Sequence, residues 1–125
     1  MFNKIHHIAI IGSNYSKSKH FYVDLLGFRI IRESKRENKG DCKIDLQCGD
    51  SEIELFIKSD APQRVSYPEA LGLRHLAFKV DDVEATVKLL NSKGIDTEPI
   101  RIDEFTHKKM TFFSDPDGLP LEIHE

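Results

Sequence analysis

Two short stretches of similar sequence organise this chain, HIAI at residues 7–10 and HLAF at residues 75–78. A second pair of similar stretches accompanies them, IEL at residues 53–55 and LEI at residues 121–123. Each later stretch lies 68 residues beyond its earlier counterpart. An echo at a fixed offset is the mark of an internal repeat, so the sequence predicts two copies of one module.

Each copy of the repeat carries one imidazole and one carboxylate. His7 and Glu54 are 47 positions apart, and so are His75 and Glu122. Two nitrogens and two carboxylates brought together by a pseudo-two-fold axis would make a site for a divalent metal. A lone histidine or glutamate on a strand is more often a surface or satisfied polar group. The recurrence of both pairs at one spacing favours the metal interpretation.

Alternating apolar residues predict the same order of elements in both copies. In the first copy we expect strands at 4–11, 28–33, 42–48 and after the turn at 49–50, with a helix from Asn14 to Gly27 and a turn at 34–40. In the second copy we expect strands at 73–80, 95–100, 109–114 and 119–124, with a helix that begins at Asp81 or Asp82 and ends at Gly94. The prediction is an α+β fold of two βαβββ modules, whose curved mixed sheets form a bowl around the metal site.

The expected organisation is one domain over residues 1–125. The first module covers residues 1–58 and the second covers residues 72–125. The segment 59–71, which holds Pro62 and Pro68, reads as the linker between them. Within each module the parity of the strands puts apolar residues such as Ile53 and Leu55 under the helix, and places Glu54 on the opposite face.

Composition limits the possible function. The chain has 125 residues, 39% of them hydrophobic and 31% charged, and a net charge of −3. No basic excess exists for nucleic-acid binding, and no apolar run is long enough to cross a bilayer. The N-terminus resembles no signal peptide, so the cytoplasm is the expected compartment. Cys42 and Cys48 lie too far apart on one strand to form a disulfide, and we expect both to be reduced and buried.

Three stretches carry a resemblance to a known family: IELF at 53–56, GLRHLAF at 72–78 and TFFSDPDGLPLE at 111–122. With the paired modules, they resemble the vicinal-oxygen-chelate superfamily of glyoxalases, bleomycin-resistance proteins and dioxygenases. The likeness is greatest to its small YaeR-like, glyoxalase-like branch. It covers essentially the whole chain and implies the glyoxalase-like fold.

The resemblance also implies a site. Its metal ligands would be His7, Glu54, His75 and Glu122, holding one divalent transition metal: Ni, Co or Zn, with Mn or Fe as further options. His7 rather than His6 keeps the family's distance to the first helix. Glu122 would be the catalytic base and Glu54 its alternative. The metal would act as a Lewis acid on a chelated carbonyl of a small-molecule substrate, and the protein would be a homodimer.

Two departures from glyoxalase I bear on the substrate. Ile11 and Lys58 stand where that family has an arginine that binds the glutamyl carboxylate of glutathione and an assisting asparagine. We therefore expect a lyase or isomerase that acts by proton abstraction and is not linked to glutathione. The alternative is a metal-dependent binding or sequestration protein, or a thiol-transfer resistance enzyme. Candidate partners for a substrate carboxylate are Lys58, Arg64, Tyr67, Arg74, Lys79, Arg101 and Lys108.

Overall fold

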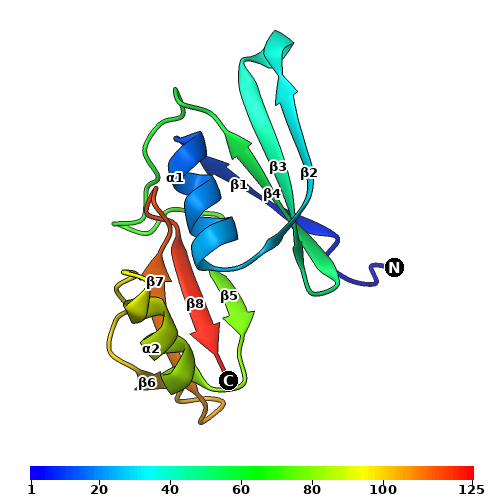
Figure 1. The fold of residues 1–125 in the computed structure, drawn as a ribbon. Helices are drawn as coiled ribbons and strands as arrows, with labels where there is room; N and C mark the ends of the chain where they lie inside the picture. Colours follow the sequence, from blue (N-terminus) through cyan, green and yellow to red (C-terminus); the bar gives the residue numbers. More distant parts are fainter. The chain divides into compact units, whose positions relative to one another are not determined.

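A computed structural model describes all of residues 1–125. The chain divides into two compact units, Met1–Pro62 and Gln63–Glu125. The boundary lies inside the segment 59–71 that the sequence suggests as a linker. Each unit contains four strands and one principal helix (Figure 1).

The first unit begins with strand β1, and its helix follows after a short turn. The elements in order are β1 (His7–Gly12), α1 (Tyr15–Lys19), a π-helical continuation of α1 (His20–Leu25), β2 (Arg29–Arg36), a 3₁₀ turn (Glu37–Lys39), β3 (Asp41–Cys48) and β4 (Ser51–Ile57). In Figure 1, β2 and β3 form a long hairpin.

The second unit repeats the order with shorter strands. Its elements are β5 (Leu76–Lys79), α2 (Val83–Ser92), β6 (Arg101–Ile102), β7 (Lys109–Ser114) and β8 (Pro120–His124). In Figure 1, α2 runs alongside the sheet of this unit.

The two sheets have the same topology. Their strand orders are β1-β4-β3-β2 and β5-β8-β7-β6, with the first two strands of each parallel and the others antiparallel. The register also repeats, since Ala9 lies opposite Glu54 and Ala77 lies opposite Glu122. The predicted α+β fold of two βαβββ modules is therefore confirmed.

One face of each sheet forms the apolar core of its unit. In the first unit, Ile44, Leu46, Ile53 and Leu55 are buried, together with Phe21 and Tyr22 of the helix. In the second unit, Val83 and Leu90 of α2 are buried, as are Phe113, Leu121 and Ile123 of the sheet. Alternation along each strand then leaves His7, Glu54 and Glu122 on the opposite face.

Both helices begin at the residues that the sequence indicates. The side chain of Asn14 accepts a hydrogen bond from Lys17 N, and that of Asp82 accepts one from Ala85 N, so Asp82 rather than Asp81 caps α2. Gly27 and Gly94 follow the helices with φ of 82° and 80°. Glycine reaches this left-handed region without steric cost, as the sequence predicts for a helix end.

Two strand predictions were wrong. Residues 95–100 are not a strand, and β6 is the short segment Arg101–Ile102. Pro99 lacks the N–H that a ladder requires, and Glu98 N alone bonds to Phe112 O. The expected turn at 34–40 starts later, because β2 pairs with β3 as far as Arg36 opposite Asp41.

Neither helix of the structure has the length and apolar character that a membrane-spanning helix needs.

The capping of α2 gives a first prediction. Asp82→Ala removes the acceptor for Ala85 N and should lower the free energy of unfolding by about 1 kcal/mol. For a chain of this size we expect a melting temperature lower by roughly 3–6 °C, measured by circular dichroism. Asp81→Ala is the matched control, because Asp81 is exposed and does not cap the helix. Equal losses in the two variants would contradict the capping role.

Candidate metal centre

The first unit brings His7 and Glu54 together on the face away from the helix. The two residues lie on the parallel pair β1 and β4, and His7 precedes by two positions the residue opposite Glu54. His7 Nε2 is 3.6 Å from Glu54 Oε2. The imidazole is 43% exposed and the carboxylate 15% exposed, so the pair lies at the surface of its unit.

The second unit repeats this pair in a tighter form. His75 Nε2 is 2.8 Å from Glu122 Oε2, with exposed fractions of 24% and 9%. The ring of Phe112 meets the imidazole edge-on, with centroids 5.1 Å apart. Phe112 also lies opposite Glu122 across the β7–β8 ladder. This pair is therefore partly enclosed by an aromatic side chain.

The geometry of each pair fits two ligands of one ion. Histidine nitrogens and carboxylate oxygens bind zinc at about 2.0–2.2 Å, which puts adjacent ligand atoms about 3 Å apart. The observed separations of 2.8 and 3.6 Å lie on either side of that value. No group of three or more histidine, cysteine, aspartate and glutamate side chains is arranged to hold an ion. Each unit thus offers two of the four expected ligands.

The other nitrogen of each imidazole has a different neighbour. His7 Nδ1 lies 2.9 Å from His6 Nδ1, and His75 Nδ1 lies 3.2 Å from the Arg74 guanidinium. Guanidinium only donates hydrogen bonds, so His75 Nδ1 accepts and Nε2 carries the proton facing Glu122. A metal at Nε2 would replace that proton, as metal binding to histidine generally does.

A charged network that the sequence analysis does not predict surrounds Glu54. Lys43 Nζ is 2.7 Å from Glu54 Oε1 and 3.2 Å from Asp45 Oδ1. Arg32 donates to Asp45 Oδ2 at 2.8 Å and contacts Glu52 at 3.0 Å. The hydrogen bond to Glu54 raises the pKa of Lys43 above its usual value. The alternation that puts Glu54 on this face also puts Lys43 and Asp45 there, so the signal was present.

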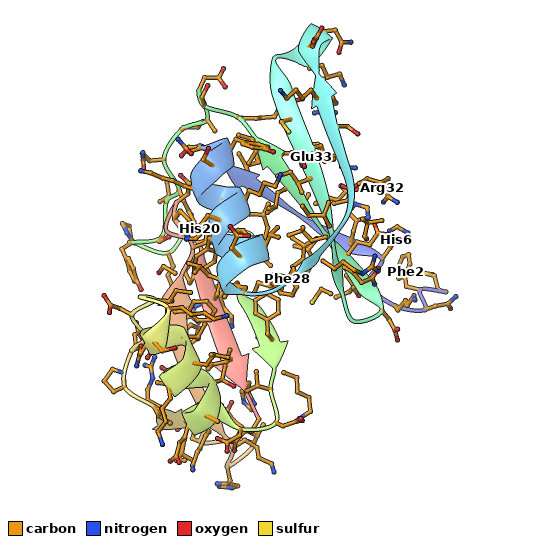
Figure 2. All side chains as sticks on the ribbon, in the orientation of Figure 1. Phe2, His6, His20, Phe28, Arg32 and Glu33 are labelled. Carbon is orange, nitrogen blue, oxygen red and sulfur yellow. The ribbon has the colours of Figure 1, made fainter.

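A β-bulge decides where Arg32 points. The register of β2 against β3 shifts between Ile30 and Arg32, which brings Arg32 opposite Asp45 and Glu33 opposite Ile44. Glu33 consequently faces the helix side, where Lys19 Nζ lies 3.0 Å from its carboxylate. In Figure 2, Arg32 and Glu33 extend from opposite sides of β2.

Glu122 lacks a comparable network. Asp45 lies opposite Glu54 in the first unit, and Phe112 lies opposite Glu122 in the second. Two positions earlier stand Lys43 and Met110 respectively. The two corresponding carboxylates therefore differ in surroundings. Glu54 pairs with an ammonium, whereas Glu122 faces Phe112 and pairs with His75.

The remaining histidines lie outside the two pairs. His20 pairs with Asp24 on the helix at 2.9 Å, and His107 is exposed. Figure 2 shows His20 on the helix and His6 near the N-terminal segment. His124 pairs with Asp103 at 3.2 Å. Hydrogen bonds to the Glu125 carbonyl and to Asp103 raise the pKa of His124.

Both cysteines are free and partly buried. Burial raises the pKa of Cys42 and of Cys48, which keeps both as thiols at neutral pH.

Among the proposed carboxylate-binding cations, several already have protein partners. Arg74 pairs with Glu69, Arg101 with Glu98, and Arg64 donates to the carbonyls of Leu73 and Arg74.

Comparison with known proteins gives consistent matches. Residues 4–123 match the family described as the Glyoxalase/Bleomycin resistance protein/Dioxygenase superfamily. The chain is 55% identical to the uncharacterized protein YwkD of Bacillus subtilis, over 100% of this chain and 98% of YwkD. It is 52% identical to the uncharacterized protein YaeR of Escherichia coli, over 98% and 95% of the two chains. The crystal structure of a glyoxalase family protein from Enterococcus faecalis matches with a TM-score of 0.95 and 60% identity, over 99% and 98%.

The pair of His124 and Asp103 gives a second prediction. The folded-state pKa of His124 is raised, so its charged form stabilises the fold below the unfolded pKa of about 6.5. That contribution is lost as the pH rises through the folded pKa. Asp103→Asn keeps the acceptor for Phe105 N but removes the charge. We expect chemical denaturation to show a larger deficit for this variant at pH 5.5 than at pH 8.5. A deficit independent of pH would contradict the pairing.

Proposed function

Because the chain belongs to the glyoxalase/bleomycin resistance protein/dioxygenase superfamily, we propose that it is a metal-dependent lyase or isomerase. It would remove a proton next to a chelated carbonyl of a small, oxygen-rich substrate. The observation that carries the proposal is the recurrence of one His–Glu pair in both units, with each histidine two positions before the residue that lies opposite the glutamate. Repetition of the fold does not by itself require a histidine and a glutamate in each unit, since apolar residues at those positions would serve the fold equally well.

The donor set fits one divalent transition metal. Two imidazole nitrogens and two carboxylates suit nickel, cobalt or zinc, with manganese and iron as further options. Since each unit offers only two ligands, a four-ligand centre has to combine His7 and Glu54 with His75 and Glu122. The two pairs would come from one chain or from two chains of a homodimer. Such a metal supplies Lewis-acid polarisation of a carbonyl and so acidifies the neighbouring C–H.

The surroundings of the two carboxylates favour Glu122 as the base. Glu122 is 9% exposed and lies beside Phe112, with no lysine or arginine paired to it. Glu122 therefore has no lysine or arginine partner to give up before it takes a proton from the substrate. Glu54 lies in the charged network of Lys43 and Asp45 and would remain a ligand. His7 and His75 would orient the substrate by fixing the centre between them.

Relatives with named activities support two classes of function. FosB of Staphylococcus saprophyticus, a metallothiol transferase, is 30% identical to this chain. The mitochondrial methylmalonyl-CoA epimerase of Mus musculus is 25% identical. The epimerase name fits proton transfer, and the transferase name fits the alternative of a thiol-transfer resistance protein.

We favour proton transfer because this chain has a carboxylate at both glutamate positions. Ile11, which takes the place of the glutathione-binding arginine, is 54% exposed and carries no charge. A substrate other than a glutathione adduct is therefore proposed, and the protein would act in the cytoplasm.

Metal content tests the proposed centre. Protein purified without chelators should contain about one divalent transition metal per chain, measured by elemental analysis. His7→Ala and His75→Ala should each lose most of it, because a site deprived of one of its nitrogens holds such a metal weakly.

His6→Ala is the matched control for metal content. His6 neighbours His7 and contacts its Nδ1, yet it does not face Glu54. This variant should keep its metal. Loss of metal in His6→Ala but not in His7→Ala would move the ligand to the other histidine. A wild-type protein that takes up neither nickel, cobalt nor zinc would refute the centre.

Substitution of the proposed base tests the reaction. A ligand is first found by thermal-shift screening of hydroxy- and ketoacids with metal. Glu122→Gln retains an oxygen that can bind metal but removes the proton acceptor. We expect exchange of a substrate α-proton with deuterated water, followed by proton NMR, to slow by about 10²–10⁴-fold. Glu54→Gln is the matched variant and should slow exchange less.

The outcome of the exchange experiment separates the two functional classes. Equal exchange in wild type and Glu122→Gln would exclude Glu122 as the base. Tight metal-dependent binding of a ligand with no proton exchange in wild type would favour a binding or thiol-transfer protein instead.

A further inference from the structure

We propose that Lys43 and Asp45 form a release pair for Glu54. Before metal binds, the Lys43 ammonium pairs mainly with Glu54. When Glu54 binds metal, the ammonium moves to Asp45. The inference rests on the proposed metal centre and assigns a positioning role to two residues that do not ligate the ion. Its consequence is that metal competes with an internal cation at Glu54 but not at Glu122.

The contacts of Lys43 are divided unequally between two carboxylates. Its Nζ lies 2.7 Å from Glu54 Oε1 and 3.2 Å from Asp45 Oδ1. Glu54 and Asp45 are themselves opposite each other across the β3–β4 ladder. A rotation of the lysine side chain is therefore sufficient to move the ammonium from one carboxylate to the other, with no change in the backbone.

Asp45 has an oxygen that the ammonium satisfies only in part. The residue is only 4% exposed, and its Oδ2 accepts a hydrogen bond from Arg32. Its Oδ1 is buried and lies 3.2 Å from Lys43 Nζ, in an ion pair that does not have the geometry of a hydrogen bond. A buried carboxylate oxygen without a well-aligned donor is energetically costly. A full shift of Lys43 toward Asp45 reduces that cost at the moment when Glu54 finds another partner.

Electrostatics gives the transfer its direction. An ammonium held against Glu54 would lie close to a divalent ion bound by the same carboxylate, and the two cations would repel. The side chain of Lys43 is only 25% exposed. Without a second carboxylate nearby, its ammonium would lose its partner in a place where water solvates it only in part. Asp45 offers a replacement carboxylate. Phe56 provides a further favourable surface, with Nζ 5.5 Å from the ring centroid.

The second unit supplies an internal comparison. Met110 and Phe112 stand at the positions that correspond to Lys43 and Asp45 relative to the ligand glutamate. Since Glu122 has no cation to displace, the release pair acts on one carboxylate of the centre alone. The alternative is a purely structural role, in which a fixed ion-pair network stabilises the pairing of β3 with β4.

The experiment is a double-mutant cycle on metal affinity. Zn²⁺ dissociation constants are measured by competition with a chromophoric chelator for wild type, Lys43→Met, Asp45→Asn and the double variant. Lys43→Met, which introduces the residue of the second unit, should bind Zn²⁺ about tenfold more tightly because the competitor is gone. Asp45→Asn should bind about tenfold more weakly, because its amide would face Lys43 while its carbonyl serves Arg32.

The double variant identifies the transfer. Without Lys43 the loss caused by Asp45→Asn should disappear, so the double variant should bind as Lys43→Met does. If the Asp45→Asn penalty persists in the absence of Lys43, the transfer is refuted. Weaker binding by Lys43→Met would refute it as well, since a lysine that only supports the site predicts that result.

Further measurements keep the proposal distinct from stability and from the proposed function. Lys43→Arg retains both ion pairs and should keep wild-type affinity. If circular dichroism shows that Lys43→Met does not fold, the affinity of Lys43→Arg is compared with that of Asp45→Asn instead. Equal affinities in these two variants would refute the transfer. Wild type that binds no Zn²⁺, Ni²⁺ or Co²⁺ refutes the metal centre itself. Wild type that binds metal with no effect in either single variant refutes the transfer alone.

Discussion

The parallel pairing of β1 with β4, and of β5 with β8, is the constraint on which the other features of the two units depend. It puts Ala9 opposite Glu54 and Ala77 opposite Glu122, and it leaves a histidine two positions earlier on the same face. Side chains alternate along a strand, so a slip of one residue would bury all four polar groups under the helices. The apolar residues Ile53, Leu55, Leu121 and Ile123 resist such a slip, because each is buried in the native register.

The repeat is symmetric in its backbone and asymmetric in its chemistry. Both units present one imidazole and one carboxylate, yet Glu54 lies among Lys43, Asp45 and Arg32, whereas Glu122 lies against His75 and Phe112. A duplicated module gives two equal carboxylates, whereas the proposed function needs one as a base and the other as a permanent ligand. Different neighbours at equivalent positions would provide that distinction without altering either strand.

Much of this arrangement could be predicted from particular residues. The spacing of the His–Glu pairs indicated the repeat, the period of two placed Glu54 opposite the buried Ile53 and Leu55, and Asn14, Gly27 and Gly94 marked helix ends that the structure confirms. The strand expected at 95–100 was wrong because the prediction gave too little weight to Pro99, which has no N–H to donate to a neighbouring strand. The end of β2 was placed too early because polar residues at 34–36 resemble a turn until their partners on β3 are known.

The sequence by itself determined the module, its duplication and the faces on which the four candidate ligands lie, because these depend on spacing and alternation along the chain. Only the tertiary structure decided that Arg32 joins Lys43 and Asp45 in the network beside Glu54. A β-bulge between Ile30 and Arg32 turns Arg32 toward Asp45 and Glu33 toward the helix side. Strict alternation would have reversed them. A bulge adds one unpaired residue to one strand, and its position is fixed by packing between strands that are far apart in sequence.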